Sequence, residues 1–140
     1  MVFEHPGWAT SWGSRMMDAM LKIPDVQSIN FDFCMLGMAT KDEKGDPAPA
    51  RKRTRIITNS KHVAAALRIC QCNGLHSHVH LESGRAKSCE EYPQAFAEII
   101  VMAFKREIED VRWLENIQSQ VMGSIMDVTK PMINLIQATE

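Results

Sequence analysis

The sequence predicts a small α/β fold: a partial sheet built on a β-hairpin, a loop rich in cysteine and histidine, and a long C-terminal helix. Three observations predict it. Apolar and polar residues alternate within residues 26–38, as in a half-buried strand, and residues 53–58 have the pattern of a second strand. Cysteines and histidines gather within residues 70–87. From residue 93 on, apolar residues recur three or four apart, which is typical of an amphipathic helix.

The composition is that of an ordinary globular protein, with 45% hydrophobic and 24% charged residues in a chain of 140. A net charge of -1 gives no overall attraction to nucleic acid, so such binding requires a local patch. The longest apolar run is shorter than the ~20 residues that cross a bilayer, and the N-terminus has no signal-peptide pattern. Four cysteines without such a signal indicate reduced thiols or metal ligands. We therefore expect an intracellular protein, nuclear or cytoplasmic, without a membrane partner.

The N-terminal part predicts a loop followed by a helix. Residues 3–12 form the loop, because Pro6 and its glycine neighbour interrupt regular structure. Ser11 or Ser14 then caps a helix that ends near Lys22, before a Pro-Asp pair.

The middle of the chain predicts a long hairpin. Between the two strands lies a polar tongue, residues 40–50, whose glycine and prolines keep it out of the core. Strand, tongue and strand in this order make an antiparallel hairpin the simplest topology. Asn59 or Ser60 then caps a short helix that runs to about residue 69.

The C-terminal segment predicts one long amphipathic helix after Pro93, kinked near Gly123 and stopped or kinked before Pro131. The chain then divides into an α/β domain with the Cys/His loop, residues 1–92, and a helical tail, residues 93–140. The apolar stripe of the tail is long enough for self-association in a bundle or coiled coil. The alternative is a helix packed along its own domain.

The Cys/His loop predicts a structural zinc site. Zn²⁺ takes four thiolate or imidazole ligands in a tetrahedron. Three of them lie within seven residues around the turn-forming Gly74, and a cysteine at the end of the first strand supplies the fourth. The candidate ligands are Cys34, Cys72, His76 and His78. The alternatives are a strand with alternating histidines on its solvated face and a fortuitous polar turn. No carboxylate base accompanies the cluster, which disfavours a catalytic metal.

A basic run precedes and begins the second strand. Alternation places Arg51, Arg53 and Arg55 on one face of that strand. Guanidiniums offer paired donors to phosphates or to a base carbonyl, whereas the alternative is a solvated edge strand protected by charge. The predicted nucleic-acid contacts are Arg51, Lys52, Arg53, Arg55, Arg85 and Lys87.

Several short motifs also occur in one order along the chain. They are Phe3-Glu4-His5-Pro6, Ser11-Trp12, Phe31-Asp32-Phe33-Cys34 through Gly37, Lys52-Arg53-Thr54 with Thr58-Asn59, Cys72 with His76 and His78, Gly84-Arg85-Ala86-Lys87, and Tyr92-Pro93. In this order they resemble a domain in the polyproteins of retrotransposon-like elements of the dinoflagellate type, over roughly residues 3–100. The resemblance implies that the chain is a polyprotein fragment.

That domain is in turn distantly similar to the second half of cytosine-5 DNA methyltransferases. The resemblance implies that Glu4 matches the glutamate that holds the cytosine ring. It matches Arg53 and Arg55 to the arginines of a Gln-x-Arg-x-Arg motif, with Arg51 where glutamine is usual, and places them beside Glu4 as one wall of a base pocket. The family's cofactor motif and Pro-Cys nucleophile lie upstream of the glutamate. The resemblance thus implies no methyl transfer by this chain alone and no S-adenosylmethionine.

Overall fold

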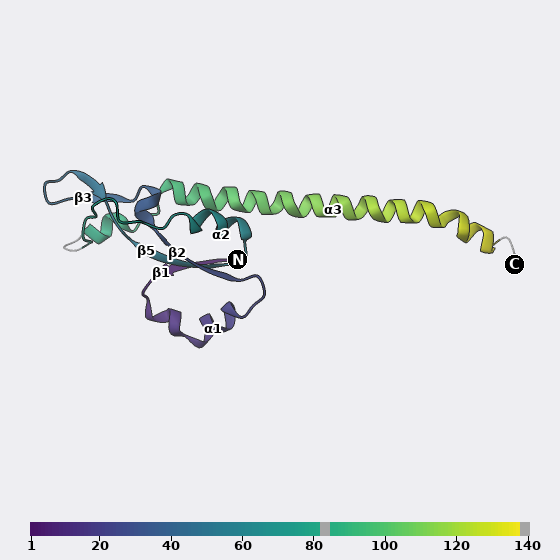
Figure 1. The fold of residues 1–140 in the computed structure, drawn as a ribbon, viewed down its shortest axis with the longest axis horizontal. Coiled ribbons are helices and arrows are strands. Elements are labelled where there is room, and N and C mark those ends of the chain that lie inside the picture. The colour runs from purple at the N-terminus through teal and green to yellow at the C-terminus, as the bar shows by residue number, and fades with distance from the viewer. Residues whose placement is uncertain (82–84, 138–140) are drawn as a thin grey trace. The chain divides into compact units, whose positions relative to one another are not determined.

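A computed structural model of the 140-residue chain describes the backbone of residues 1–81 and 85–137 and the side chains of residues 1–81 and 86–123. Helices and strands are mixed, so the small α/β class is confirmed (Figure 1). The elements are β1 (Val2–Pro6), η1 (Thr10–Gly13), α1 (Arg15–Leu21), β2 (Gln27–Asp32), η2 (Phe33–Leu36), β3 (Ala39–Lys41), β4 (Pro47–Pro49), β5 (Arg53–Thr58), α2 (Lys61–Arg68), η3 (Arg85–Cys89) and α3 (Gln94–Gln137).

The main sheet has the strand order β1-β5-β2, and both of its pairs are antiparallel. The predicted hairpin is confirmed, since β2 pairs with β5, and the tongue between them folds into the small β3–β4 sheet. The predicted loop over residues 3–12 is wrong in its first part. Residues 2–6 form β1 because the free edge of β5 offers them backbone partners, from Val2 opposite Thr58 to Pro6 opposite Thr54.

The first hairpin strand is shorter than predicted. It ends at Asp32, and Phe33 begins the 3-10 turn η2. Gly37 closes this turn with a φ of 83°, a left-handed conformation that favours glycine. The turn sets Cys34 at the end of the sheet, which matters for the site below.

The sheet buries both of its faces. One face carries Ile29, Phe31 and Ile56, which pack in one cluster with residues of α2 and with Phe96 of α3. The other face carries Ile57, which packs with Trp12 and Met17. Figure 1 accordingly shows α1 and α2 on opposite sides of the sheet. Burying a side chain such as Phe31 stabilises the fold by about 1.5–3 kcal/mol.

Both short helices begin at serine caps, which decides between the predicted alternatives. Ser14 Oγ accepts a hydrogen bond from the Met17 N–H at 3.4 Å, and Ser60 Oγ accepts one from the Val63 N–H at 3.1 Å. Each bond satisfies a backbone donor that the first helical turn leaves unpaired, which contributes about 1 kcal/mol.

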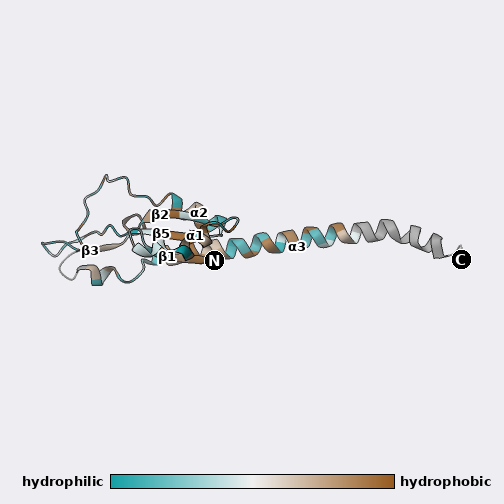
Figure 2. Cartoon of the chain, turned by 90° about the horizontal axis from the view of Figure 1, so that it is seen from below, coloured by the Kyte–Doolittle hydropathy of each residue, from teal (hydrophilic) through white to brown (hydrophobic). Residues whose placement is uncertain are grey.

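The helix α3 is continuous from Gln94 to Gln137, so it does not stop before Pro131. Its first turns pack in the core beside the sheet, where Phe96 and Ala103 are buried. The contacts therefore divide the chain into the compact units Met1–Phe104 and Lys105–Glu140, whereas the sequence places the division between residues 92 and 93. Figure 2 shows hydrophobic and hydrophilic residues alternating along the described part of α3. In the part of the chain that the structure describes, no helix has both the length and the apolar content that crossing a membrane requires.

Candidate metal centre

Two thiols and two imidazoles meet where β2 ends. One ligand atom from each of Cys34, Cys72, His76 and His78 lies within 4.8 Å of every other, so the group could hold a metal ion. The Cys72 Sγ lies 3.7 Å from the His76 Nε2 and 3.4 Å from the His78 Nε2. In a tetrahedron with a Zn–S distance of about 2.3 Å and a Zn–N distance of about 2.05 Å, the S···N edge is about 3.5 Å. The two distances from the Cys72 Sγ to the histidine nitrogens are thus close to the edge of a zinc tetrahedron.

A buried carboxylate fixes the loop that carries three of these ligands. Asp32, at the end of β2, is fully buried. Its Oδ2 accepts a hydrogen bond from the Cys72 N–H at 3.0 Å, and its own N–H donates to the Cys70 carbonyl at 2.9 Å. Since Cys34 follows Asp32 by two residues, one short segment positions ligands from both sides of the site.

The loop itself turns at Gly74. This residue has a φ of 76°, and its N–H donates to the Cys72 Sγ at 3.4 Å. Such a bond stabilises a thiolate, since it places a donor on the developing charge. Further along, the Val79 N–H donates to the Pro49 carbonyl at 2.9 Å, which ties the other end of the loop to β4. His76 and His78 therefore lie between two anchored ends.

Without a metal, burial and the neighbouring groups disfavour the charged forms of Cys34 and His78. Burial, followed by the hydrogen bond with Cys72, raises the pKa of Cys34 to about 11. Burial, followed by the positive charges of His76 and Arg51, lowers the pKa of His78. A divalent metal displaces the thiol protons, because it replaces the repulsion between two adjacent thiolates by attraction to one cation.

The donor set fits zinc in particular. Two sulfur and two nitrogen donors in a tetrahedron are typical of Zn²⁺, and four protein ligands leave no open position for a substrate. His80, which alternates with His76 and His78 in the sequence of the loop, is not one of the four clustered residues. The arrangement therefore suits a structural metal rather than a catalytic one.

The predicted nucleic-acid residues lie in several different places. Asp32 Oδ1 lies 3.1 Å from the Nε of Arg51 and 3.8 Å from the Nε of Arg53, so the structure brings these two arginines together. Arg55 instead stacks over the Trp12 ring, with its Cζ 4.7 Å from the ring centroid.

The remaining basic residues are separate from that pair. Lys52 Nζ donates to the Cys89 carbonyl at 3.3 Å and lies over the Phe33 ring. Lys87 is exposed in η3. The side chain of Arg85 lies outside the described residues.

Glu4 and the arginines are not on one face. In the register, Glu4 lies opposite Ile56 and His5 lies opposite Arg55, and directly opposed residues share a face of the sheet. Glu4 thus points to the side of α2 and α3, where its Oε2 accepts a hydrogen bond from the Tyr92 hydroxyl. That bond, together with burial, raises the pKa of Tyr92 to about 12. The β1 and β5 backbones are neighbours, but the carboxyl and the guanidiniums of β5 do not form a common wall.

Three residues that matter here were given no role from the sequence. Asp32 is a charged residue inside an otherwise apolar segment, which is a signal of a buried and paired carboxylate. Trp8 stands in a Pro-Gly turn and is largely exposed. Tyr92 precedes the helix that Pro93 begins, and nothing local indicates its contact with Glu4.

Comparison of the chain with family models, curated proteins and solved structures finds no match.

Proposed function

We propose that the chain is a zinc-stabilised structural module that self-associates through α3. The observation that carries the proposal is the convergence of the Cys34, Cys72, His76 and His78 ligand atoms within 4.8 Å. Bound Zn²⁺ supplies a four-way cross-link between the end of β2 and the loop after α2. Metal binding free energy of this kind adds to folding free energy, because the unfolded chain has no complete site.

Metal analysis of the purified full chain tests the zinc site. We expect about one zinc per chain, lost in Cys34→Ser and in Cys72→Ser. Cys70→Ser is the matched control, because Cys70 lies two residues before Cys72 but is not one of the clustered ligands. If wild-type protein that has been refolded with added zinc and then purified contains no zinc, the site is refuted.

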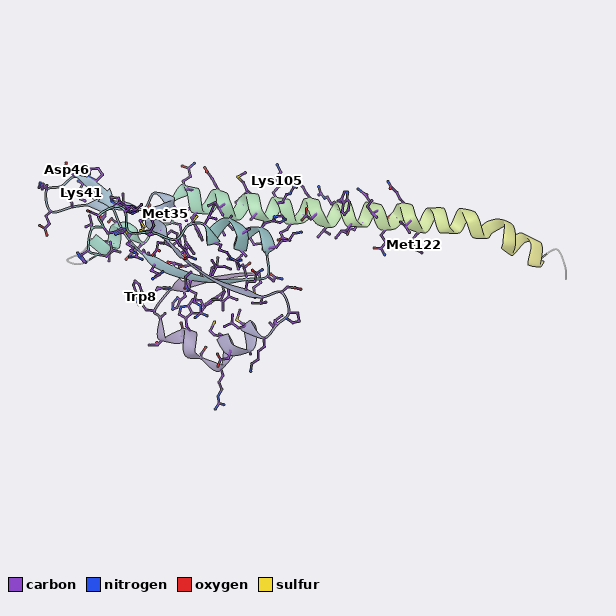
Figure 3. All side chains as sticks on the ribbon, in the orientation of Figure 1. Trp8, Met35, Lys41, Asp46, Lys105 and Met122 are labelled. Carbon is purple, nitrogen blue, oxygen red and sulfur yellow. The ribbon has the colours of Figure 1, made fainter. Side chains whose placement is uncertain are left out.

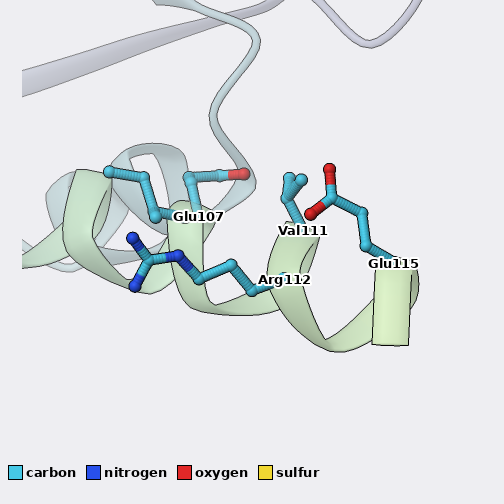
Figure 4. Close-up of a pocket in the computed structure, with 5 residues that line it drawn as sticks. Glu107, Val111, Arg112 and Glu115 are labelled. Atoms are coloured by element: carbon cyan, nitrogen blue, oxygen red, sulfur yellow. The ribbon is translucent and has the colours of Figure 1, made fainter. Parts of the chain in front are cut away.

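The second part of the proposal rests on the apolar surface of α3. Within residues 105–123, seven large apolar side chains are between 42% and 63% exposed. They are Ile108, Val111, Trp113, Leu114, Ile117, Val121 and Met122. Val111 also lines a shallow pocket of about 350 Å³ on the helix, between Glu107 and Glu115 (Figure 4). An exposed stripe of this length favours contact with another helix.

A seven-residue spacing supports a second copy of α3 as that helix. Counting from Phe104, two series seven apart are apolar at all but two of their positions. The series are Phe104, Val111, Gln118, Ile125 and Met132, and Glu107, Leu114, Val121, Val128 and Leu135. Two helices whose apolar residues repeat every 3.5 residues can pack these residues against each other in a coiled coil. A second copy of α3 has the required repeat. Single polar residues within such a seam fix its register.

The methyltransferase-like and retroelement reading stays a prediction. The opposite orientations of Glu4 and Arg55 favour the interaction module over a base pocket built on them. A structural metal with four protein ligands supports the same choice, since it offers no reactive position.

A further inference from the structure

A surface pocket of about 570 Å³ lies beside the metal loop. The pocket combines an exposed indole with an arginine and two histidines. Its lining residues are Trp8, Arg51, His78, Val79, His80 and Leu81. Its volume lies within the range of small-ligand sites. The pocket shares only His78 with the four candidate zinc ligands, and none of its lining residues belongs to α3.

Arg51, which lines the pocket, and Arg53, which lies next to it, are held by the same carboxylate. Arg51 donates its Nε–H to Asp32 Oδ1, and the Nε of Arg53 lies 3.8 Å from the same oxygen. Among the described residues, the Nη atoms of both guanidiniums make no hydrogen bond, and the two side chains are 38% and 45% exposed. One carboxylate faces two cations, so the pair keeps a surplus positive charge with free donors on its outer edge. That edge suits a phosphate.

The aromatic side of the pocket is Trp8. Its side chain is 72% exposed, whereas Trp12 is buried. Figure 3 shows Trp8 standing out from the turn after β1. The turn is held in place, because the Gly7 N–H donates to the Arg53 carbonyl at 3.0 Å. A Cβ on Gly7 would lie 3.3 Å from the Arg53 Cγ, so the arginine stem packs directly on this glycine. The turn that carries the indole is thus anchored next to Arg53.

We propose that this pocket binds a nucleotide unit of single-stranded nucleic acid, with the base stacked on Trp8 and its phosphate held by Arg51 and Arg53. An exposed aromatic ring beside a cationic groove is how proteins bind single strands with little sequence preference. A duplex keeps its base faces stacked internally and offers none to Trp8. The proposal narrows the contact predicted from the basic run to one site and adds Trp8. The three residues that would hold the nucleotide, Trp8, Arg51 and Arg53, are neither zinc ligands nor part of α3.

Fluorescence anisotropy with a labelled oligodeoxythymidylate of about ten nucleotides tests the stacking. In the full chain, we expect Trp8→Ala to weaken binding at least about fivefold, because stacking on one aromatic residue typically contributes that much or more. Trp8→Phe should recover part of the loss, since it keeps a ring. Trp113→Phe is the control, because it changes another exposed indole, on α3. Binding that is unchanged by Trp8→Ala overturns the proposal.

The phosphate contact has its own readout. The slope of log Kd against log salt should fall by about 0.7 for Arg53→Ala and should not change for Arg15→Ala, an exposed arginine on α1. An equal slope in both variants contradicts the assignment. A duplex of the same sequence should bind more weakly. Thymidine 5′-monophosphate that competes as tightly as the oligonucleotide would overturn the single-strand assignment in favour of a free nucleotide.

The zinc content and the solution mass of the same preparations separate this proposal from the previous one. Trp8→Ala should lose oligonucleotide binding while it keeps the metal and mass of the wild type. A protein that lacks zinc or is monomeric but shows the expected Trp8 and Arg53 effects refutes the zinc-stabilised module and supports the nucleotide site.

Discussion

Asp32 and Cys72, forty residues apart in the sequence, are joined by a 3.0 Å hydrogen bond from the Cys72 N–H to the Asp32 Oδ2. The other oxygen of the same buried carboxylate accepts from Arg51. The carboxylate therefore links three features: the end of the sheet, the metal loop and the basic side of the pocket. A buried charge with partners on both oxygens is costly to alter, because any change leaves one partner unsatisfied.

Asp32→Asn should weaken zinc binding about 10–100-fold, the usual effect of altering a group that orients metal ligands. The amide keeps the shape but removes the charge that Arg51 and Arg53 face and reduces the acceptors available to the Cys72 N–H. Competition with a chromophoric chelator measures the affinity. Asp18→Asn, at an exposed position on α1, is the control. Equal zinc affinity in Asp32→Asn and wild type would mean that Asp32 does not orient the loop.

Gly74→Ala should lower both stability and zinc affinity. A left-handed alanine costs about 1–2 kcal/mol, and here any relief of that strain moves the N–H away from the Cys72 Sγ. Gly45→Ala is a matched control, since Gly45 has a φ of 90° in the β3–β4 turn, away from the ligands. We expect a comparable loss of stability in both variants and a loss of zinc affinity in Gly74→Ala only. Chelator competition measures the zinc affinity and urea unfolding measures the stability. An equal fall in zinc affinity in both variants would contradict a specific role of Gly74 at the metal site.

Leu114→Asp should shift self-association toward the monomer. Leu114 lies in the apolar series of α3 and is 58% exposed, so a carboxylate there would have to be buried at the contact with another copy. Asn116→Asp introduces the same charge two residues away at an exposed position outside that series. Sedimentation equilibrium over a range of concentrations gives the masses. A wild-type chain that stays monomeric at every concentration contradicts the proposal outright.

The Tyr92–Glu4 contact should stabilise the fold up to high pH. The pKa of Tyr92 is raised from 10.0 to about 12 in the folded protein, chiefly by its hydrogen bond to Glu4. The folded state therefore holds the phenol proton more tightly than the unfolded state does. This contribution is fully present below pH 10 and is lost as the pH rises toward 12. We expect the difference in unfolding free energy between wild type and Tyr92→Phe to shrink over this range in urea titrations. A difference that is constant from neutral pH to pH 12 would contradict the assignment.

The metal cluster was predictable because its chemistry is visible in the residues themselves. Cys72, His76 and His78 are close in the sequence, and Cys34 follows a recognisable strand, so only one long-range contact had to be guessed. The hairpin was predictable for a similar reason, since apolar and polar residues alternate in β2.

Other features depend on register, which a single sequence does not specify. β1 was missed because Glu4, His5 and Pro6 have no alternating pattern, and every residue of the strand is only half-buried at the sheet edge. Whether Glu4 shares a face with Arg55 depends on a shift of one residue, since such a shift turns every side chain to the other face. The charge of Asp32 inside an apolar segment signals a buried carboxylate, but its partners Arg51 and Cys72 could not be identified without the fold.

The placement of Cys34 has a kinetic consequence. The stretch between Cys34 and Cys72 includes β3, β4, β5 and α2. A metal bound to both cysteines therefore closes this stretch into a loop. In the unfolded chain, only Cys72, His76 and His78 of the four ligands are close enough in the sequence to bind one ion together. The last coordinating sulfur arrives when β2 docks against β5, so tight coordination in a time-resolved experiment would mark the moment at which the sheet closes.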